Sequence, residues 1–293
     1  IEPVSTSRLS RWRSTILADI TPLKVSVDFR RIFFAQLVSQ IGTQMTAVVL
    51  LLQIFDISRS NLATGLVGAV AFLPMVIGGL YGGSIADARD RRAVAYWTTT
   101  GLAGFSLVFA GMAYSDLRLL WPYYVLIAGQ TWLSAIAQPT RMAIIPRLVG
   151  AELLPAANAL AQISWNIGFT LGPVIGATIA KSYGFGWAYL VDALSFAGAV
   201  YAYWRLPPVV PDADDDHKAG LASVLEGLRY LKGRKNLSMT FYVDIVAMVF
   251  GMQRVLFASI PLAFYGLAVV GFGPINVSLS GLLFAAPAVG AIV

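Results

Sequence analysis

Two long uncharged stretches, separated by a short and highly charged one, most constrain how this chain can fold. Residues 63–81 and residues 93–114 contain no Asp, Glu, Lys or Arg. Each stretch is long enough to cross about 30 Å of hydrocarbon as an α-helix. Residues 82–92, which lie between them, carry five charged side chains. The pattern predicts two membrane-spanning helices joined by a short loop at one face of the membrane.

The rest of the chain repeats this pattern. It is 57% hydrophobic and only 12% charged, against about 25% charged residues in a typical soluble domain. An open sheet cannot satisfy its backbone hydrogen bonds in lipid, so the apolar segments are expected to be helices. They occupy residues 32–55, 63–81, 93–114, 119–139, 158–180, 187–204, 240–264 and, incompletely, 280–293. The sequence therefore predicts an all-α membrane protein without a separate soluble domain.

The basic residues are distributed very unequally between the two sets of loops. If the N-terminus is cytoplasmic, the inner loops hold seventeen Lys and Arg residues and the outer loops hold only Arg59, Arg118 and Lys181. Cytoplasmic loops of membrane proteins carry such an excess. A nucleic-acid-binding protein would instead gather its basic residues on one face. We therefore predict a cytoplasmic N-terminus and a cytoplasmic loop at residues 82–92.

Four segments can be distinguished along the chain. Residues 1–27 combine basic residues with apolar ones at helical spacing, as in a helix that lies on the lipid surface. Residues 28–206 hold six spans, and residues 207–238 form an acidic, proline-containing cytoplasmic linker followed by an amphipathic helix. Residues 239–293 supply the first one or two helices of a second set. Because its last fourteen residues would cover only about 21 Å as a helix, we interpret the chain as part of a longer protein.

The loop at residues 82–92 resembles the signature of the major facilitator superfamily of transporters, G-x-L-A-D-R-x-G-R-K/R. Gly83, Asp87, Arg91 and Arg92 match it. Asp90 replaces the second glycine, and Asp tolerates the left-handed conformation that glycine supplies. Asp87 can accept hydrogen bonds from a neighbouring helix N-terminus and pair with Arg91, which would latch the two halves of such a protein together. The simpler interpretation is an ordinary basic loop.

A second resemblance lies in residues 168–177 of the fifth span. Gly168, Gly172 and Gly176 fall at intervals of four on one helix face, and Pro173 removes a backbone hydrogen bond. The segment is similar to the G-x-x-x-G-P-x-x-G-G element of drug–proton antiporters, and this resemblance favours export over uptake. Without it, the glycines indicate only close helix packing.

Polar side chains within the spans are candidates for the lining of a substrate cavity. Amides that faced lipid would be costly, so these helix faces are expected to point at protein or water. The candidates are Gln36, Gln40, Gln44, Asn158, Gln162, Asn166 and Arg254. For each amide the alternative is hydrogen bonding between helices, and for Arg254 it is neutralisation of an acid on another helix. Trp132, Trp165 and Phe169 could stack on a planar substrate or pack in the core.

Acidic residues within the spans, or at their ends, are candidates for proton coupling. These are Asp192, Asp244 and Asp56. For Asp192 the alternative is an interfacial position with access to water. The chain has no cysteine, and its single histidine, His217, lies in the acidic linker. We therefore expect neither a metal site, nor a cofactor, nor an enzyme active site.

Further segments are similar to one subfamily, which contains the bacterial enterobactin exporter and macrolide-type efflux pumps. They are residues 28–31, 141–149, 225–231 and 281–287, in addition to the two elements above. The resemblance implies a monomeric twelve-helix protein of the bacterial inner membrane that exports drugs or siderophore-like metabolites by proton antiport through alternating access. Its partners would be the lipid bilayer, a small-molecule substrate and protons, with no nucleic acid. A proton-coupled uptake symporter and a non-transporting membrane scaffold or sensor remain alternatives.

Overall fold

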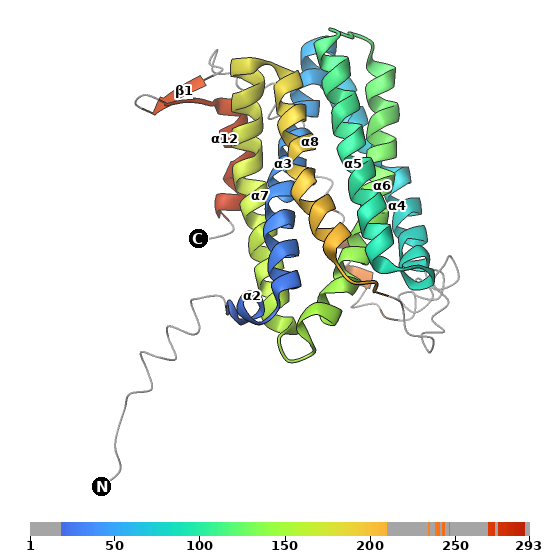
Figure 1. Ribbon diagram of the computed structural model, residues 1–293. Coiled ribbons are helices and arrows are strands. Elements are labelled where there is room, and N and C mark those ends of the chain that lie inside the picture. The colour runs from blue at the N-terminus through green and yellow to red at the C-terminus, as the bar shows by residue number, and fades with distance from the viewer. Residues whose placement is uncertain are drawn as a thin grey trace.

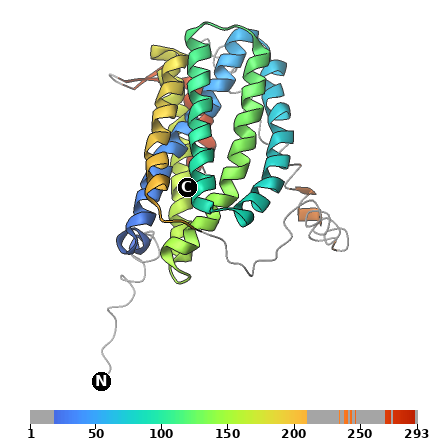
Figure 2. The ribbon, with the colours of Figure 1, turned by 45° about the vertical axis from the view of Figure 1, so that its right-hand side comes forward.

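Six long helices form a bundle (Figures 1 and 2). The computed structural model describes residues 19–209, 234, 238–240, 242–243, 246, 269–272 and 275–290, without the side chains of residues 80, 83, 84, 86–88, 269–278, 280, 285 and 287–290. A short helix, α2 (Thr21–Val25), precedes the bundle. The bundle consists of α3 (Val27–Ser58), α4 (Asn61–Ala88), α5 (Arg91–Tyr114), α6 (Leu120–Val149), α7 (Leu154–Tyr183) and α8 (Phe185–Arg205). Further along lie strands β1 (Val269–Phe272) and β2 (Ile275–Ser278) and helix α12 (Leu279–Gly290).

The helices pack in pairs that are distant in sequence. The closest pairs are α4 with α6, α3 with α7, and α5 with α8, while α12 lies against α7. Each of the first six predicted spans corresponds to one of these helices. The predicted seventh span, at residues 240–264, falls almost entirely outside the described residues.

Five described helices have stretches long and apolar enough to cross a membrane: Val27–Ser58, Asn61–Gly79, Arg91–Tyr114, Leu154–Tyr183 and Phe185–Arg205. The remaining long helix, α6, has 30 residues but a lower hydropathy, because Trp121, Tyr124, Gln130 and Trp132 interrupt its apolar residues. Its length of about 45 Å and its contacts with α4 and α5 place it inside the same bundle.

The prediction that all of residues 82–92 form a loop is wrong. Helix α4 continues to Ala88 and α5 begins at Arg91, so only Arg89 and Asp90 lie between the helices. Gly82 explains the continuation: a Cβ atom there would lie 2.9 Å from Ile136 Cα and 3.0 Å from the Ala135 carbonyl oxygen. The close approach lets α4 remain helical along α6 beyond its apolar stretch.

The fourth predicted span also continues further than expected. We predicted its end at Pro139, but α6 runs through Pro139 and Pro146 to Val149. Proline is tolerated inside membrane helices where neighbouring groups satisfy the freed carbonyl. As a result Arg141 lies within a helix and not in a loop.

Polar side chains and glycines define where the helices begin and end. Ser26 Oγ accepts a hydrogen bond from the Phe29 N–H at 3.2 Å at the start of α3, and Ser60 Oγ caps α4 in the same way. Such caps satisfy N–H groups that have no partner within the helix. Gly184, which separates α7 from α8, has φ +94°, a conformation that glycine adopts without strain. This conformation permits a one-residue connection between two long antiparallel helices.

A short hairpin departs from the all-helical expectation for the region after the sixth span. Strands β1 and β2 are antiparallel, with Val269 opposite Ser278 and Phe272 opposite Ile275. β-branched and aromatic residues favour strands, and the sequence between them is Gly273-Pro274, a typical turn dipeptide. The hairpin lies at the end of the bundle opposite α2 (Figure 1).

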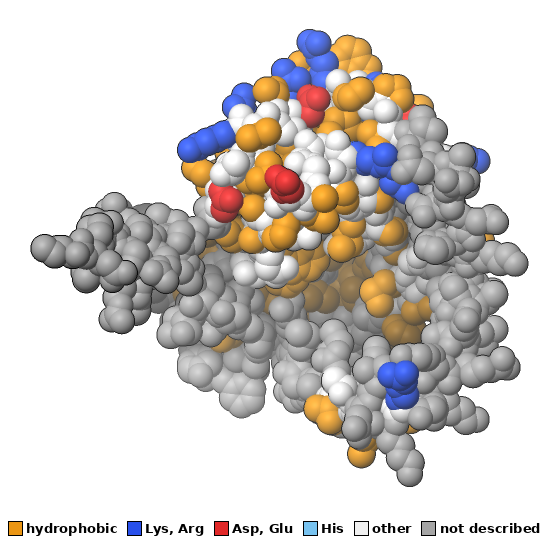
Figure 3. Space-filling model, turned by 90° about the horizontal axis from the view of Figure 1, so that it is seen from below, with side chains coloured by type: hydrophobic (Ala, Val, Ile, Leu, Met, Phe, Trp, Pro, Cys, Tyr) orange, Lys and Arg blue, Asp and Glu red, His pale blue; other side chains and the backbone are white. Residues whose placement is uncertain are grey.

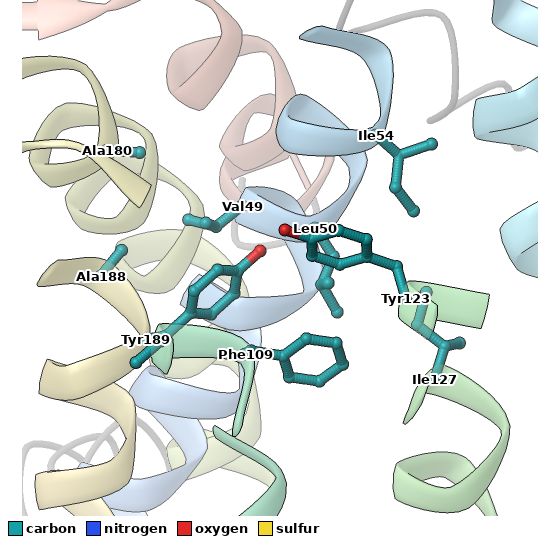
Figure 4. Close-up of a cluster of buried hydrophobic side chains, with 10 residues drawn as sticks. Val49, Leu50, Ile54, Phe109, Tyr123, Ile127, Ala180, Ala188 and Tyr189 are labelled. Carbon is teal, nitrogen blue, oxygen red and sulfur yellow. The ribbon is translucent and has the colours of Figure 1, made fainter. Parts of the chain in front are cut away.

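Apolar side chains occur both in the bundle core and on its outer surface, as expected for a membrane protein. In the core, Phe109 stacks on Tyr189 at a ring distance of 5.4 Å, and both pack with Val49, Ile54 and Tyr123 (Figure 4). The outer surface of α4 also exposes large apolar side chains, including Leu62, Leu66, Phe72, Leu73 and Met75. Apolar residues on this face suit contact with lipid.

Candidate functional site

A polar pocket opens between α3, α6 and α7 in the half of the bundle nearest α2. Its volume is about 360 Å³, within the range of small-molecule sites. The lining residues are Phe29, Ile32, Phe33, Gln36 and Gln40 from α3, Gln138, Arg141, Met142 and Ile145 from α6, and Asn158, Ala161, Gln162, Ser164 and Trp165 from α7. No Asp or Glu is among these described lining residues.

The structure brings together four of the seven predicted cavity residues. Gln36, Gln40, Asn158 and Gln162 all line the pocket. Gln44 lies instead at the contact between α3 and α7, close to Gly172. Asn166 does not line the pocket, and Arg254 is outside the described residues. Gln36 also donates a hydrogen bond of 2.7 Å to Tyr203 Oη, so that it links α3 to α8.

Three lining residues carry a buried polar atom without a hydrogen-bond partner in the described part of the chain. These atoms are Gln40 Nε2, Arg141 Nε and Ser164 Oγ. Buried polar groups are nearly always paired, and an unpaired one costs about 1–3 kcal/mol. Their occurrence in one pocket indicates a site that is prepared for a polar ligand or for water.

Sequence reasoning did not identify Arg141 or Gln138 as pocket residues, because we placed Arg141 in a cytoplasmic loop. The spacing of Gln138, Arg141 and Ile145 puts them on one helix face, which would have identified them had the helix been extended past Pro139. Of the predicted aromatic residues, Trp165 lines the pocket and packs against Phe169, with ring centroids 5.0 Å apart. Trp132 packs against Tyr81, away from the pocket.

Asp192 lies in α8 at the centre of the bundle and is completely buried. Thr46 Oγ1 of α3 and Ser106 Oγ of α5 donate hydrogen bonds of 2.6 and 2.7 Å to its Oδ2 atom. Ser195 Oγ lies 3.5 Å from Oδ1. An interfacial position with access to water therefore does not describe this residue. Among the interactions of described residues, its side-chain partners are hydroxyl groups and include no cation.

A glycine makes room for this carboxyl group. A Cβ atom at Gly42 of α3 would clash with Ser195 Oγ and would lie 2.5 Å from Asp192 Oδ1. Helices α3 and α8 thus cross where a polar cluster replaces apolar packing.

The other two proton-coupling candidates have different surroundings. Asp56 lies near the end of α3, is half exposed, and pairs with Arg59 Nη2 at 2.6 Å. Asp244 is outside the described residues. Asp192 is therefore the only one of the three candidates that the described structure places inside the bundle.

The glycines of the fifth span line the contact between α7 and α3. A Cβ atom at Gly168 would lie 2.7 Å from Gln40 Cγ, and one at Gly176 would lie 2.9 Å from Met45 Cα. At Gly172 the corresponding distance to the Ile41 carbonyl oxygen is 2.8 Å. Pro173 is buried in the same helix. The two backbones therefore approach as closely as glycine permits.

The turn between α4 and α5 is joined to the chain that leaves α8. Asp90 accepts hydrogen bonds of 3.0 Å from the N–H groups of Arg92 and Val209, and the Arg91 N–H donates to the Val209 carbonyl. Arg92 donates to the last carbonyls of α8, those of Tyr203 and Trp204. Asp90 has φ −54°, so this turn does not use the left-handed conformation that a glycine would supply. The side chains of Gly83 and Asp87 are outside the described set.

Removing the Asp90 carboxylate is expected to destabilise this turn. Asp90→Ala loses a helix cap and the bond to Val209, and the free energy of unfolding should fall by about 1–2 kcal/mol. Asn is an equally good cap, so Asp90→Asn should retain most of the stability. Thermal unfolding in detergent would measure both variants, with Asp56→Ala as a control that removes only a surface ion pair. An Asp90→Ala midpoint equal to that of the control would contradict this role for Asp90.

The end of the bundle with α2 is rich in basic residues. Lys24, Arg30, Arg89, Arg92, Arg147 and Arg205 lie at this end of their helices, whereas Arg59, Arg118 and Lys181 lie at the other. Figure 3, which views this face, shows Lys and Arg side chains at several places on it. The helix order in the structure thus produces the charge asymmetry that the loops predicted.

Comparison with known proteins identifies the family. The model of the transmembrane secretion effector family, a family of the major facilitator superfamily, matches residues 17–293. The chain belongs to this family. It is a multi-pass membrane protein.

Individual relatives of this chain are more distant. The enterobactin exporter EntS of Shigella boydii serotype 18 is 27% identical over 220 residues, which cover 73% of this chain and 51% of that protein. EntS of Escherichia coli O157:H7 is 26% identical over the same shares. The chain spans about half the length of the curated relatives it matches.

A solved structure supports the fold. The crystal structure of a POT family transporter in complex with a thioalcohol-conjugated peptide covers 82% of this chain and 52% of its own chain, with a TM-score of 0.54. Its sequence identity is 14%, so the similarity concerns the fold alone.

Proposed function

We propose that this member of the transmembrane secretion effector family is a proton-coupled exporter of siderophore-like metabolites or drugs, with its N-terminus in the cytoplasm. The observation that carries the proposal is the pocket of amides and one guanidinium between α3, α6 and α7, inside a bundle with an apolar outer surface. A polar cavity of this kind within membrane helices is typical of a substrate pathway.

Two further observations support the direction and the energy source. The relatives named as exporters of enterobactin match most of this chain, which favours export of a similar compound. Asp192 is a buried acid within the bundle whose side-chain partners in the described part of the chain are hydroxyl groups, and intramembrane carboxyl groups frequently carry protons in transporters. Proton binding and substrate binding would each favour a different orientation of the cavity.

The charges of the bundle support a cytoplasmic N-terminus. The end that contains α2, the α4–α5 turn and the α6–α7 turn holds most of the described Lys and Arg residues. By the distribution typical of membrane proteins this end faces the cytoplasm. The pocket then lies in the half of the bundle nearest the cytoplasm, from which an exporter takes its substrate.

Transport by inverted membrane vesicles tests the proposal. Vesicles that contain the full-length protein should accumulate enterobactin when respiration acidifies their interior, and an ionophore that collapses the pH gradient should reduce accumulation to that of vesicles without the protein. Accumulation that survives collapse of the gradient would contradict proton coupling. Accumulation only by right-side-out vesicles would favour the alternative, an uptake symporter.

A further inference from the structure

The pocket between α3, α6 and α7 contains a positive charge that no described residue neutralises. Arg141 makes no hydrogen bond or ion pair with any described residue, and its Nε atom is buried. Three other arginines of the bundle form ion pairs: Arg31 with Asp28, Arg59 with Asp56, and Arg118 with Asp116. Arg141 is only partly buried, but a guanidinium with a buried, unpaired N–H group is unfavourable without a counter-ion and favourable when an anion binds to it.

Neighbouring lining residues add hydrogen-bond donors. Gln40 Nε2 and Ser164 Oγ are also buried and unpaired in the described part of the chain. They lie close to one another along the α3–α7 contact, because Gln40 packs on Gly168, one helical turn beyond Ser164. A guanidinium, an amide N–H and a hydroxyl group form a set of donors without an acidic residue, which suits an oxyanion.

The remaining walls indicate what is attached to that anion. Phe29, Phe33 and Trp165 contribute aromatic surface to the same pocket. Aromatic rings bind planar apolar groups by stacking. The lining thus combines one anion-binding end with apolar walls.

We propose that Arg141 is the specificity-determining residue of this pocket and binds the anionic group of an aromatic substrate, such as a carboxylate or phenolate, with Gln40 and Ser164 as additional donors. The proposal rests on the proposed function only because it treats the pocket as the substrate site. The phosphate group of an anionic lipid offers the same anionic oxygens, and the experiment below distinguishes a substrate anion from a lipid headgroup.

A matched pair of probes tests the charge requirement. Salicylate and its neutral amide, salicylamide, differ little in size, and binding to the purified protein in zwitterionic lipid nanodiscs can be followed through tryptophan fluorescence. Salicylate should bind at least about tenfold more tightly than salicylamide, as expected for a charge-assisted hydrogen bond. Arg141→Gln should remove this preference by weakening salicylate binding alone, and Arg141→Lys should retain part of it.

Controls distinguish a binding role from a structural one. Arg118→Gln, at the opposite end of the bundle and on the surface, should leave the preference unchanged. Because Arg141 lacks a partner among the described residues, Arg141→Gln should keep or raise the thermal midpoint. A large fall in that midpoint would indicate a structural ion pair and would overturn the proposal.

The other possible results of these experiments also test the proposal. Equal binding of the two probes to the wild-type protein, or an unchanged preference in Arg141→Gln, would overturn the proposal. Salicylate binding that vanishes when phosphatidylglycerol is added would assign the site to a lipid headgroup and would overturn the proposal as well.

The experiments also separate this inference from the proposed function. If Arg141→Gln exports enterobactin normally and also keeps the anion preference, this inference fails while the proposed function stands. If the anion preference is found but vesicles show no export, the proposed function fails and Arg141 remains an anion-binding residue.

Discussion

Asp192→Asn is expected to abolish export driven by a pH gradient while leaving the fold intact. Asn has nearly the same shape as Asp and can still accept hydrogen bonds from Thr46 and Ser106, which contact the carboxyl group at 2.6 and 2.7 Å. It cannot release or bind a proton. Transport in inverted vesicles should therefore fall by about tenfold or more, in line with the loss of a positioned acid–base group, whereas the thermal midpoint should stay close to that of the wild-type protein.

Asp192→Ala is the companion variant for the same site. It leaves the Thr46 hydroxyl without its acceptor, whereas Ser106 can still donate to the Leu102 carbonyl at 3.3 Å. It also creates a cavity, and the lost hydrogen bond and the cavity each cost about 1–3 kcal/mol. The alanine variant should therefore lose stability as well as transport. If the asparagine variant exports its substrate with the pH dependence of the wild-type protein, Asp192 is only a structural link between α3, α5 and α8.

Gly172→Ala is expected to force α3 and α7 apart. The added methyl group would lie 2.5 Å from Gln44 Cβ, 2.8 Å from the Ile41 carbonyl oxygen and 3.1 Å from the Met45 nitrogen. Two of these neighbours are backbone atoms that cannot rotate away. Overpacking of this kind costs about 1–3 kcal/mol, and the thermal midpoint in detergent should fall by several degrees.

Gly104 provides the matched control, because a Cβ atom there would meet nothing within 4 Å. Gly104→Ala, also inside a membrane helix, should be neutral or slightly stabilising because alanine is the better helix former. The comparison separates the loss of close packing from the general effect of replacing a glycine. Equal midpoints for the two variants would show that the α3–α7 contact relaxes at little cost.

The uncharged, largely apolar segments predicted the six long helices of the bundle, because an uncharged segment of about twenty residues has few alternatives in lipid. The match to the transmembrane secretion effector family confirms the fold class. The ends of the helices were less predictable. Continuation of α4 to Ala88 depends on contact with α6 at Gly82, and continuation of α6 beyond Pro139 depends on its neighbours. Neither contact can be recognised from the sequence of one helix alone.

The pocket, like the helices, was predictable from the sequence only in part. The four-residue spacing of Gln36 and Gln40 predicted one polar face, and both residues line the pocket. Gln44 continues the spacing but lies against Gly172, because the helices converge beyond Gln40. The pattern thus predicts which side of the helix faces inward, and only the crossing of α3 and α7 decides where the space ends.

Asp90 has a consequence for the chain that leaves α8. Its carboxylate and the Arg91 N–H hold both backbone groups of Val209, four residues after the end of α8. Val209 is therefore fixed to the α4–α5 turn, in the segment that carries the superfamily signature. We expect a force applied to the chain beyond Val209 to reach this turn before it reaches α8.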